Sequence, residues 1–466
     1  MPGATRGHAR PGSAELAALA GVLLLAAGLR VVGAAYGLPY PLLNPDEESV
    51  VPRAWRMVHG GGLDPGWFDY PTLLMYLQAP WQAVAAEPSY GLARVVAVAA
   101  GLGGVAAAWW LGRRAYGRLA GLIGAAGVAV ATTHVAYSRM AVTDVLLTTF
   151  VTVALALALA GRLEWAGAAT GLAASTKYPG AVVLVPLLVA GVGHWRRLAV
   201  AGSLAVLAFA ATSPFVVLRA GAAWDDVSRV QRLARAGWLG FEHDEASPVA
   251  FGDRLWEALG PLTLVAVVGV AIALRRRTHA DLVLLAFVAA YAVYLLPLGA
   301  HFGRYVLPLI PVLAVLAGRS RLLAALAFML VLVPLAWSVG DARDLTRTDT
   351  REQAAAWVET AVPAGAARIA LDPSTLPLDD RDAIRLELPG PGRPSDPRRD
   401  LARLRRLGVD YVVVSGAVTD RVLAARDRYP REAAFYDALE REAPVAFAAD
   451  PGASGLGGPW VRVFRL

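Results

Sequence analysis

Two adjacent acidic residues near the start of the chain have a setting that suits proton transfer. Asp46 and Glu47 follow Asn44-Pro45, shortly after the first apolar run ends. A carboxylate at a membrane interface, partly shielded from water, can have its pKa raised enough to act as a general base. Helix capping is the structural alternative, because Asn suits an N-cap, Pro suits the first turn, and acids there complement the helix dipole. A helix start would also fix both carboxylates beside the outer end of the first helix.

The only lysine of the chain is a second candidate. Lys177 stands among 44 Lys and Arg residues, so every other basic residue is arginine. It lies between two short apolar runs, where a charge is costly. An ammonium differs from a guanidinium in shape, hydration and reach, so its retention in an arginine-rich chain indicates a chemical need. A lysine that snorkels to a membrane surface is the alternative.

Further charged residues lie near the ends of other apolar runs. Arg30, inside the first run, is expected to face a cavity or an acidic partner, or else to snorkel to the outer interface. Asp144 opens a later run, where it either compensates a helix dipole or faces the same chamber as Asp46. Arg304 is suited to pairing with a phosphate. These acids and cations converge on one predicted membrane face, which suits a phosphorylated lipid whose tail stays in the bilayer.

Composition places the chain among polytopic membrane proteins. The mean hydropathy is +0.49 and 56% of residues are hydrophobic, more than a soluble chain of this length needs. Residues 1–340 hold 25 basic and 17 acidic residues, whereas residues 341–466 hold 19 and 20. The positive excess of the first part is typical of cytoplasmic loops. The absence of cysteine excludes disulfides and thiolate chemistry, and nothing indicates a nucleic-acid partner.

The apolar runs predict nine full membrane spans and one broken hairpin. Residues 165–193 are too short for two spans and are interrupted at Lys177, so two short helices are expected whose tip approaches the outer face. Residues 37–88 form a long outer loop that carries the Asp-Glu pair. Arginine-rich connectors then fall on the cytoplasmic side. The spans are residues 14–36, 90–111, 119–137, 142–160, 198–218, 256–274, 281–298, 304–318 and 321–339.

A second domain is predicted from residue 341, where charge, Pro and Gly rise and apolar runs shrink to strand length. Nine spans from a cytoplasmic start place this small α/β domain, residues 341–466, outside the membrane. The expected fold class is therefore mainly α: a transmembrane bundle, residues 1–340, followed by an extracytoplasmic α/β domain. Strands are expected at 368–371, 411–414 and 461–464, and helices at 351–361, 400–407 and 431–441.

The order of these motifs resembles that of the GT-C superfamily of membrane glycosyltransferases, in the branch that includes protein O-mannosyltransferases and lipid A aminoarabinose transferases. The resemblance spans most of the chain. Its C-terminal part is carried by Asp349-Thr350-Arg351, Trp357 and Val409-Asp410-Tyr411. The motifs of the membrane part are Arg30 followed by Asp46-Glu47, Tyr70-Pro71-Thr72-Leu73, Ser138-Arg139 with Asp144, Thr176-Lys177-Tyr178-Pro179-Gly180, and Arg304-Tyr305-Val306-Leu307-Pro308.

The resemblance implies inverting transfer of a sugar from a polyprenyl-phosphate donor to an acceptor hydroxyl, at the outer face of a bacterial plasma membrane. Asp46 is then the general base, and Lys177 and Arg304 stabilise the departing phosphate. The acceptor is a glycan, a lipid or a protein. Family members differ in their use of a divalent cation, and His59, His134 and His301 show no metal-ligand spacing. Substrate-binding residues implied by the motifs are Arg30, Glu47, Tyr70, Asp144, Lys177, Tyr178, Arg304 and Tyr305.

A transporter or flippase for a lipid-linked glycan is the alternative from another class. It would use the same cations to hold a phosphate but would not need Asp46 as a base. No internal repeat is visible in the sequence, and an inverted repeat would have favoured a transporter. A non-catalytic envelope scaffold is disfavoured, because the acid and cation motifs are all present.

Overall fold

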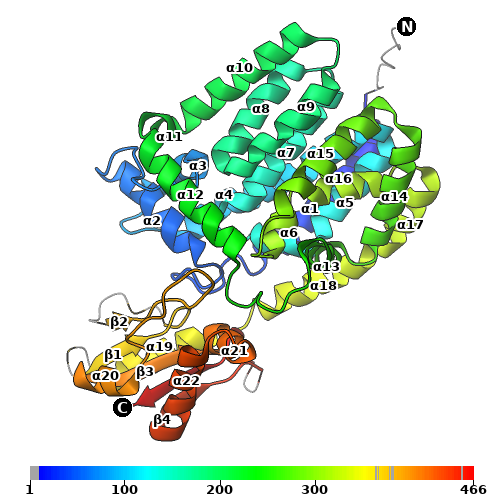
Figure 1. Ribbon diagram of the computed structural model, residues 1–466. Coiled ribbons are helices and arrows are strands. Elements are labelled where there is room, and N and C mark those ends of the chain that lie inside the picture. The colour runs from blue at the N-terminus through cyan, green and yellow to red at the C-terminus, as the bar shows by residue number, and fades with distance from the viewer. Residues whose placement is uncertain (1–9, 363–364, 366, 377, 379–382, 453–454) are drawn as a thin grey trace.

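A large helical part and a small α/β domain make up the protein (Figure 1). The computed structural model describes residues 10–466 except 363–364, 366, 377, 379–382 and 453–454. The helical part contains α1 (Ser13–Val31), α2 (Asp46–Val58), α3 (Leu73–Gln82), α4 (Tyr90–Tyr116), α5 (Arg118–Val130), α6 (Thr132–Tyr137), α7 (Thr143–Leu159), α8 (Leu163–Thr176), η1 (Tyr178–Val183), α9 (Leu184–Ala190), α10 (Trp195–Thr212), α11 (Pro214–Leu218), α12 (Ala220–Ala236), α13 (Ser247–Leu259), α14 (Leu262–Arg276), α15 (His279–Leu295), η2 (Gly303–Val306), α16 (Leu309–Ala317), α17 (Arg321–Leu330) and α18 (Leu332–Asp344).

Small residues let these helices pack closely. A Cβ on Gly167 of α8 would lie 2.0 Å from the carbonyl oxygen of Ala201 in α10, and one on Gly112 of α4 would lie 2.4 Å from that of Ala120 in α5. Close backbone approach through Gly and Ala is characteristic of helix pairs in membranes, where packing rather than water exclusion drives association. Glycine and alanine therefore allow the helices of the bundle to pack closely against each other.

Long apolar helices confirm the predicted transmembrane helical fold. Among the described residues, α1, α4, α10 and the stretch Arg321–Asp344 are long and apolar enough to cross a membrane. The pair α13 and α14 would make a fifth span, although it is bent by 117°. Large apolar side chains point outward on these helices, as Leu24 and Val206 do with 74% and 68% of their surface exposed. Such faces suit contact with lipid.

Several predicted spans are interrupted where the sequence suggested continuous helices. The span expected at 119–137 divides at Ala131 into α5 and α6, and the one expected at 198–218 divides at Ser213 into α10 and α11. The span expected at 256–274 contains the sharp bend at Gly260, which has a φ of 55° and precedes a proline. The predicted hairpin at 165–193 is confirmed as α8, η1 and α9, broken at Lys177, whose backbone is extended.

The two ends of the helical part differ in charge. At the end where α1 begins, Arg113 lies 2.6 Å from Glu15, and Arg319 forms an ion pair with Asp281. At the opposite end, where α1 terminates, lie the loop that leads to Asp46 and the junction with the α/β domain. The connectors that carry Arg113 and Arg319 therefore share one end of the bundle, where Tyr116 and Arg319 both contact Asp281, and the acidic motif lies at the other.

The α/β domain contains a five-stranded sheet of order β2-β1-β3-β5-β4. The strand β1 pairs in parallel with β2 and β3, whereas β5 is antiparallel to both β3 and β4. The three predicted strands are present as β1, β3 and β5, and β2 and β4 were not predicted. The elements are β1 (Arg368–Leu371), β2 (Ala383–Arg385), β3 (Val409–Ser415), β4 (Val445–Ala449), β5 (Val461–Arg465), α19 (Thr350–Ala361), α20 (Leu401–Arg406), α21 (Gly416–Ala424) and α22 (Pro430–Glu442).

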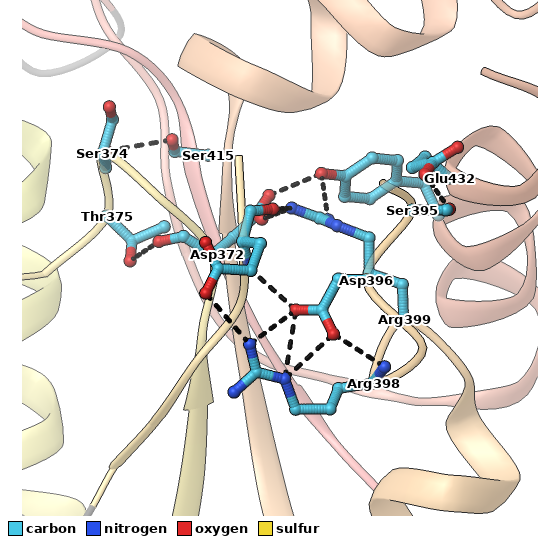
Figure 2. Close-up of polar contacts among 11 residues, drawn as sticks. Asp372, Ser374, Thr375, Ser395, Asp396, Arg398, Arg399, Ser415 and Glu432 are labelled. Carbon is cyan, nitrogen blue, oxygen red and sulfur yellow. Dashed lines mark hydrogen bonds and ion pairs between the residues drawn. The ribbon is translucent and has the colours of Figure 1, made fainter. Parts of the chain in front are cut away.

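A buried polar network ties the sheet of this domain to α22. Asp372, directly after β1, accepts hydrogen bonds from Arg399 at 2.6 Å and from the Tyr436 hydroxyl at 2.6 Å. Arg399 also donates to Tyr436 at 2.8 Å. Figure 2 shows Asp372 and Arg399 in this network. All three side chains are buried, and each charge has an opposite or hydrogen-bonding partner, as burial requires. The network fixes α22 over the sheet.

Two contact regions join the domain to the end of the helical part that carries Asp46. In the first region, the Tyr36 hydroxyl donates to Asp349 at 2.7 Å, and Arg351 donates to the Leu42 carbonyl at 2.9 Å. At the second contact, residues 237–246 reach into the domain, where Leu239 is 1% exposed within its core and Glu242 accepts a hydrogen bond from Tyr429 at 2.5 Å. The α/β domain is thus held directly against the loops around Asp46.

Candidate active site

Asp46 lies at the first turn of α2 and is the centre of a polar cluster. Its backbone N–H donates to the Asn44 side chain at 2.9 Å, although the N-cap position itself is held by Pro45 and not by Asn44 as the capping alternative expected. Its carboxylate accepts hydrogen bonds from Arg304 at 2.6 Å and from the Tyr70 hydroxyl at 3.0 Å. Because only the backbone N–H of Asp46 contacts Asn44, the Asp46 carboxylate remains available for chemistry.

The charge state of Asp46 follows from its neighbours. Burial raises the pKa of its carboxyl, but Arg304 and Lys177 oppose this, and the Tyr70 hydrogen bond adds to their effect. The net result is a pKa below the ordinary value, so the carboxylate is ionised at neutral pH. The sequence suggested a raised pKa, and the structure gives the opposite direction because two cations face the group. An ionised carboxylate is the form that accepts a proton.

Lys177 joins the same cluster from the break in the α8–α9 hairpin. Its ammonium lies 2.6 Å from an oxygen of Asp144 at the start of α7. It also lies 5.4 Å from the centre of the Tyr70 ring and 5.3 Å from that of Tyr305, within range of cation–π attraction. Only 11% of the side chain is exposed. The lysine therefore points inward and does not snorkel to a membrane surface.

Hydroxyl groups from three separate segments position this part of the cluster. Ser213, between α10 and α11, lies 2.6 Å from the hydroxyl of Ser175, two residues before Lys177. The Ser213 hydroxyl also accepts a hydrogen bond from the backbone of Thr72, two residues after Tyr70. The breaks at Ser213 and Lys177 are therefore joined to each other. This explains how the Tyr-Pro motif and the lysine motif meet.

Three buried polar atoms in or beside the cluster have no hydrogen-bond partner within the described part of the chain. They are one carboxylate oxygen of Asp144, the Nε of Arg304 and the hydroxyl of Thr143. Buried polar atoms are normally satisfied, and exceptions concentrate where a ligand or water is expected. The unpartnered donor on Arg304 suits an anion, and the unpartnered oxygen on Asp144 suits a hydroxyl.

Glu47 and Arg30 lie outside this cluster. The Glu47 carboxylate is fully buried, accepts from Arg94 at 2.7 and 2.9 Å, and also accepts the Ala141 backbone N–H at 2.8 Å. Arg94 was not singled out from the sequence, although an arginine inside a predicted span is a signal for a buried partner. The geometry replaces the predicted substrate contact of Glu47 with an ion pair that ties α2 to α4.

Arg30 also has a different role from either one expected. It is buried and donates to the carbonyl oxygens of Ala129 at 2.9 Å and Val128 at 3.0 Å, at the end of α5. It further donates to a ring nitrogen of His134 at 2.9 Å. A guanidinium suits helix carbonyls that lack intrahelical partners. Arg30 therefore satisfies the break between α5 and α6, and neither snorkels nor meets an acid there.

Tyr178 is turned away from the cluster. Its hydroxyl donates to the Phe68 carbonyl at 2.9 Å, which connects η1 to the loop before Tyr70. His301, expected on the same outer side, lies 3.0 Å from Asp244 and 3.1 Å from the hydroxyl of Ser247. No group of three His, Asp or Glu side chains that could hold a metal ion occurs within residues 10–466, the uncertain positions aside. The donor set thus gives no support for a resident divalent cation.

The chain resembles known proteins in part of its sequence and in its fold. Residues 69–218 match the family described as dolichyl-phosphate-mannose-protein mannosyltransferase, a segment that contains Tyr70, Asp144 and Lys177. No curated protein sequence matches the chain. Among solved structures, the chain resembles ArnT from Cupriavidus metallidurans bound to undecaprenyl phosphate, with a TM-score of 0.51 and 19% identity over 66% of this chain. It spans 59% of the length of ArnT.

A second set of similar structures covers nearly the whole chain. The oligosaccharyltransferase AglB from Archaeoglobus fulgidus, in complex with an inhibitory peptide and a dolichol-phosphate, has a TM-score of 0.59 and 12% identity over 96% of this chain and 74% of its own. The form tethered to an acceptor peptide gives 0.58 over the same shares. The chain has the GT-C fold. Asp46, Lys177 and Arg304 thus meet at one end of the helical part of a protein with the GT-C fold.

Proposed function

We propose that this GT-C protein is a membrane glycosyltransferase that moves a sugar from a polyprenyl-phosphate donor to an acceptor hydroxyl. The observation that carries the proposal is the contact between the Asp46 carboxylate, the Arg304 guanidinium and the Tyr70 hydroxyl, with Lys177 beside the same tyrosine. A base and two cations at one point are what transfer from a phosphate leaving group requires.

The reaction runs as a single displacement with inversion. Asp46 accepts the proton of the acceptor hydroxyl while that oxygen attacks the anomeric carbon. The bond from this carbon to the phosphate oxygen breaks on the opposite face, and the lipid phosphate leaves with the electron pair. Arg304 and Lys177 stabilise the charge that develops on the phosphate. The free Nε of Arg304 is available for this contact while Nη1 still holds Asp46.

The remaining members of the cluster position the substrates. Asp144 holds Lys177 with one oxygen and has its other oxygen free for a hydroxyl of the sugar or the acceptor. Tyr70 and Tyr305 flank the lysine and present aromatic faces. Glu47 and Arg30 position the helices that carry these groups. Similarity to proteins solved with undecaprenyl phosphate and with a dolichol-phosphate supports a lipid phosphate as part of the donor.

The proposed setting is the outer face of a bacterial plasma membrane. The connectors that carry Arg113 and Arg319 lie at the opposite end of the bundle from Asp46, and the positive-inside rule supports a cytoplasmic location for that end. The α/β domain, joined to the loops around Asp46, is then extracytoplasmic. The acceptor is a glycan, a lipid or a protein hydroxyl that reaches this side.

The test is transfer from radiolabelled polyprenyl-phosphate sugars in membranes that contain the wild-type protein or Asp46→Asn. We expect the variant to lose at least about 100-fold in rate, because the amide cannot accept the proton. Asp225→Asn, an exposed aspartate on α12, is the matched control and should retain the wild-type rate. Full transfer by Asp46→Asn would exclude its role as the base. Transbilayer movement of the donor without transfer, equal in both proteins, would indicate a flippase instead.

A further inference from the structure

A pocket of about 190 Å³ lies in the α/β domain, between α21, α22 and the neighbouring strands β3 and β5. This volume accommodates roughly six water molecules, the size of one small polar ring rather than an extended chain. We infer that the pocket binds one neutral sugar ring, and that this sugar belongs to the acceptor. The binding does not depend on the transferase activity proposed above, whereas the identity of the sugar as acceptor does.

The lining of the pocket matches the two kinds of surface on a sugar ring. Val414, Leu439 and Phe464 are buried side chains that form an apolar floor. Trp460 adds an indole wall, and such a flat apolar surface packs well against the C–H face of a pyranose. Arg462 pairs with Asp450 at 2.8 Å, and its remaining N–H groups would donate to the hydroxyl rim of the same ring. A ligand site of this type combines apolar walls with a few placed polar groups.

The polar groups of the pocket provide both donors and acceptors. Arg462 only donates, whereas the carboxylate of Glu440 only accepts and is exposed at the rim. A sugar hydroxyl can donate and accept at once, so a ring with several hydroxyls satisfies this mixed set. A simple anion would face the carboxylate of Glu440, and a simple cation would face Arg462. The mixture therefore favours a neutral polyhydroxy ligand.

Thr419 gives an independent indication of a ligand. Its side chain on α21 is 3% exposed and lines the pocket, yet its hydroxyl has no hydrogen-bond partner among the described residues. A buried hydroxyl without a partner is destabilising, so it is normally paired within the fold or by a ligand. A sugar hydroxyl placed in the pocket would supply that partner.

The walls of the pocket are fixed before any ligand binds. Tyr436, which lines the pocket, is held by Asp372 and Arg399 in the buried network that ties α22 to the sheet. The Trp460 indole N–H donates to Asp420 at 3.1 Å. A Cβ on Gly416 would lie 2.6 Å from the same indole nitrogen, so glycine at this position admits the ring. A preformed wall lowers the entropic cost of binding a small ligand.

The pocket lies on the side of the domain that contacts the catalytic part. His243 contacts α21, the helix that carries Thr419. A ring nitrogen of His243 lies 3.2 Å from the carbonyl oxygen of Ala424 in this helix. His243 belongs to residues 237–246, in which Phe241 packs edge-on against Phe302 at 4.9 Å. The Arg304 guanidinium lies 4.6 Å from the same Phe302 ring. The helix α21 that borders the pocket is thus linked to the loop that carries Arg304 through residues 237–246.

The test is saturation-transfer NMR and calorimetric titration of full-length protein in detergent, with methyl hexopyranosides as probes. We expect saturable binding with a Kd in the millimolar range, as befits a single ring. Thr419→Val keeps the shape and removes the hydroxyl, and should weaken binding about tenfold. Trp460→Ala should abolish it. Thr360→Val, an exposed threonine bonded only within α19, is the matched control and should bind as wild type.

Two results would overturn the inference. One is the absence of saturable binding of every methyl hexopyranoside to the wild-type protein. The other is binding that is equal in wild type, Thr419→Val and Trp460→Ala, which would place the sugar elsewhere. Asp46→Asn separates this site from catalysis, because it should bind the glycosides as wild type does. Saturable binding by a wild-type protein that transfers sugar from no donor would leave the sugar site in place and reject only the proposed function.

Discussion

At the scale of single residues, the cluster shows why one lysine persists in a chain that otherwise uses arginine. The Lys177 ammonium fits between the rings of Tyr70 and Tyr305 while it contacts Asp144 at 2.6 Å. A guanidinium is planar, larger and forked, so it cannot occupy the same point between two rings. Arg304 donates to Asp46 with Nη1 and keeps its Nε free. Only a guanidinium, with several N–H groups in a fixed plane, can contact two partners in this way. Each cation therefore has the shape that its place requires.

Lys177→Arg tests this assignment. We expect the rate of sugar transfer to fall about 10- to 100-fold although the charge is kept, because the donor to the phosphate is displaced. Initial rates with labelled donor at saturating concentration are the measurement. Arg321→Lys, at the exposed start of α17, is a matched exchange between the same two residue types and should leave the rate unchanged. A wild-type rate in Lys177→Arg would reject a specific need for lysine.

Tyr70→Phe tests the electrostatics of Asp46. The Tyr70 hydroxyl donates to this carboxylate and, with Arg304 and Lys177, lowers its pKa against the effect of burial. Removal of the hydroxyl should therefore raise the pKa of Asp46, so that activity is lost at a higher pH as the solution is acidified. The acid limb of kcat/KM against pH should shift upward, while the rate at pH 8 changes little. An unshifted limb would show that Asp46 does not control it.

At the scale of elements, sequence patterns predicted the helices and strands that carry a strong local signal. The strand β3 is a run of valines and was found, whereas β4 is rich in alanine and mostly exposed, so its pattern is weak. The break at Ser213 directly precedes Pro214, which was a usable signal, whereas the break at Ala131 is marked only by the polar residues Thr132 and Thr133 that follow it. Gly260 followed by Pro261 was a usable signal for the bend between α13 and α14.

Long-range pairs are the part of the site that sequence could not provide. The meeting of Asp46 with Arg304 depends on contacts between segments that are 258 residues apart. The partners of Glu47 and Arg30 likewise depend on how the helices pack, so the sequence predicted that Asp46 and Glu47 both face the site. In the helix they point in different directions, because successive residues lie on different faces. One faces the cluster and the other faces α4.

Glu47→Gln tests the structural role of the second acid. Breaking a buried ion pair leaves Arg94 without its charge partner, which costs about 3–5 kcal/mol in free energy of unfolding. We expect a large fall in the thermal midpoint of the detergent-solubilised protein. Glu164→Gln removes the acid of a more exposed pair with Arg197 and should cost within about 1 kcal/mol. Equal midpoints for the two variants would contradict the assigned role.

At the scale of the whole molecule, the two parts are joined through residues 237–246 as well as through the chain itself. Leu239 is buried in the core of the α/β domain, and Trp238 lies under the Arg393 guanidinium at 4.4 Å. The same segment contacts Phe302, next to the loop that carries Arg304. The α/β domain therefore packs, through residues 237–246, against the loop beside the candidate active site.

Leu239→Asp tests this coupling. A carboxylate in the domain core costs roughly 3 kcal/mol or more, so residues 237–246 should detach from the domain. We expect faster proteolytic cleavage within this segment and a reduced transfer rate, although no residue of the Asp46 cluster is altered. Leu407→Asp places the same charge at a more exposed position of the same domain and should change neither. Faster cleavage with an undiminished rate would show that the α/β domain docks without supporting catalysis, because the loop that carries Arg304 would then keep its geometry unaided.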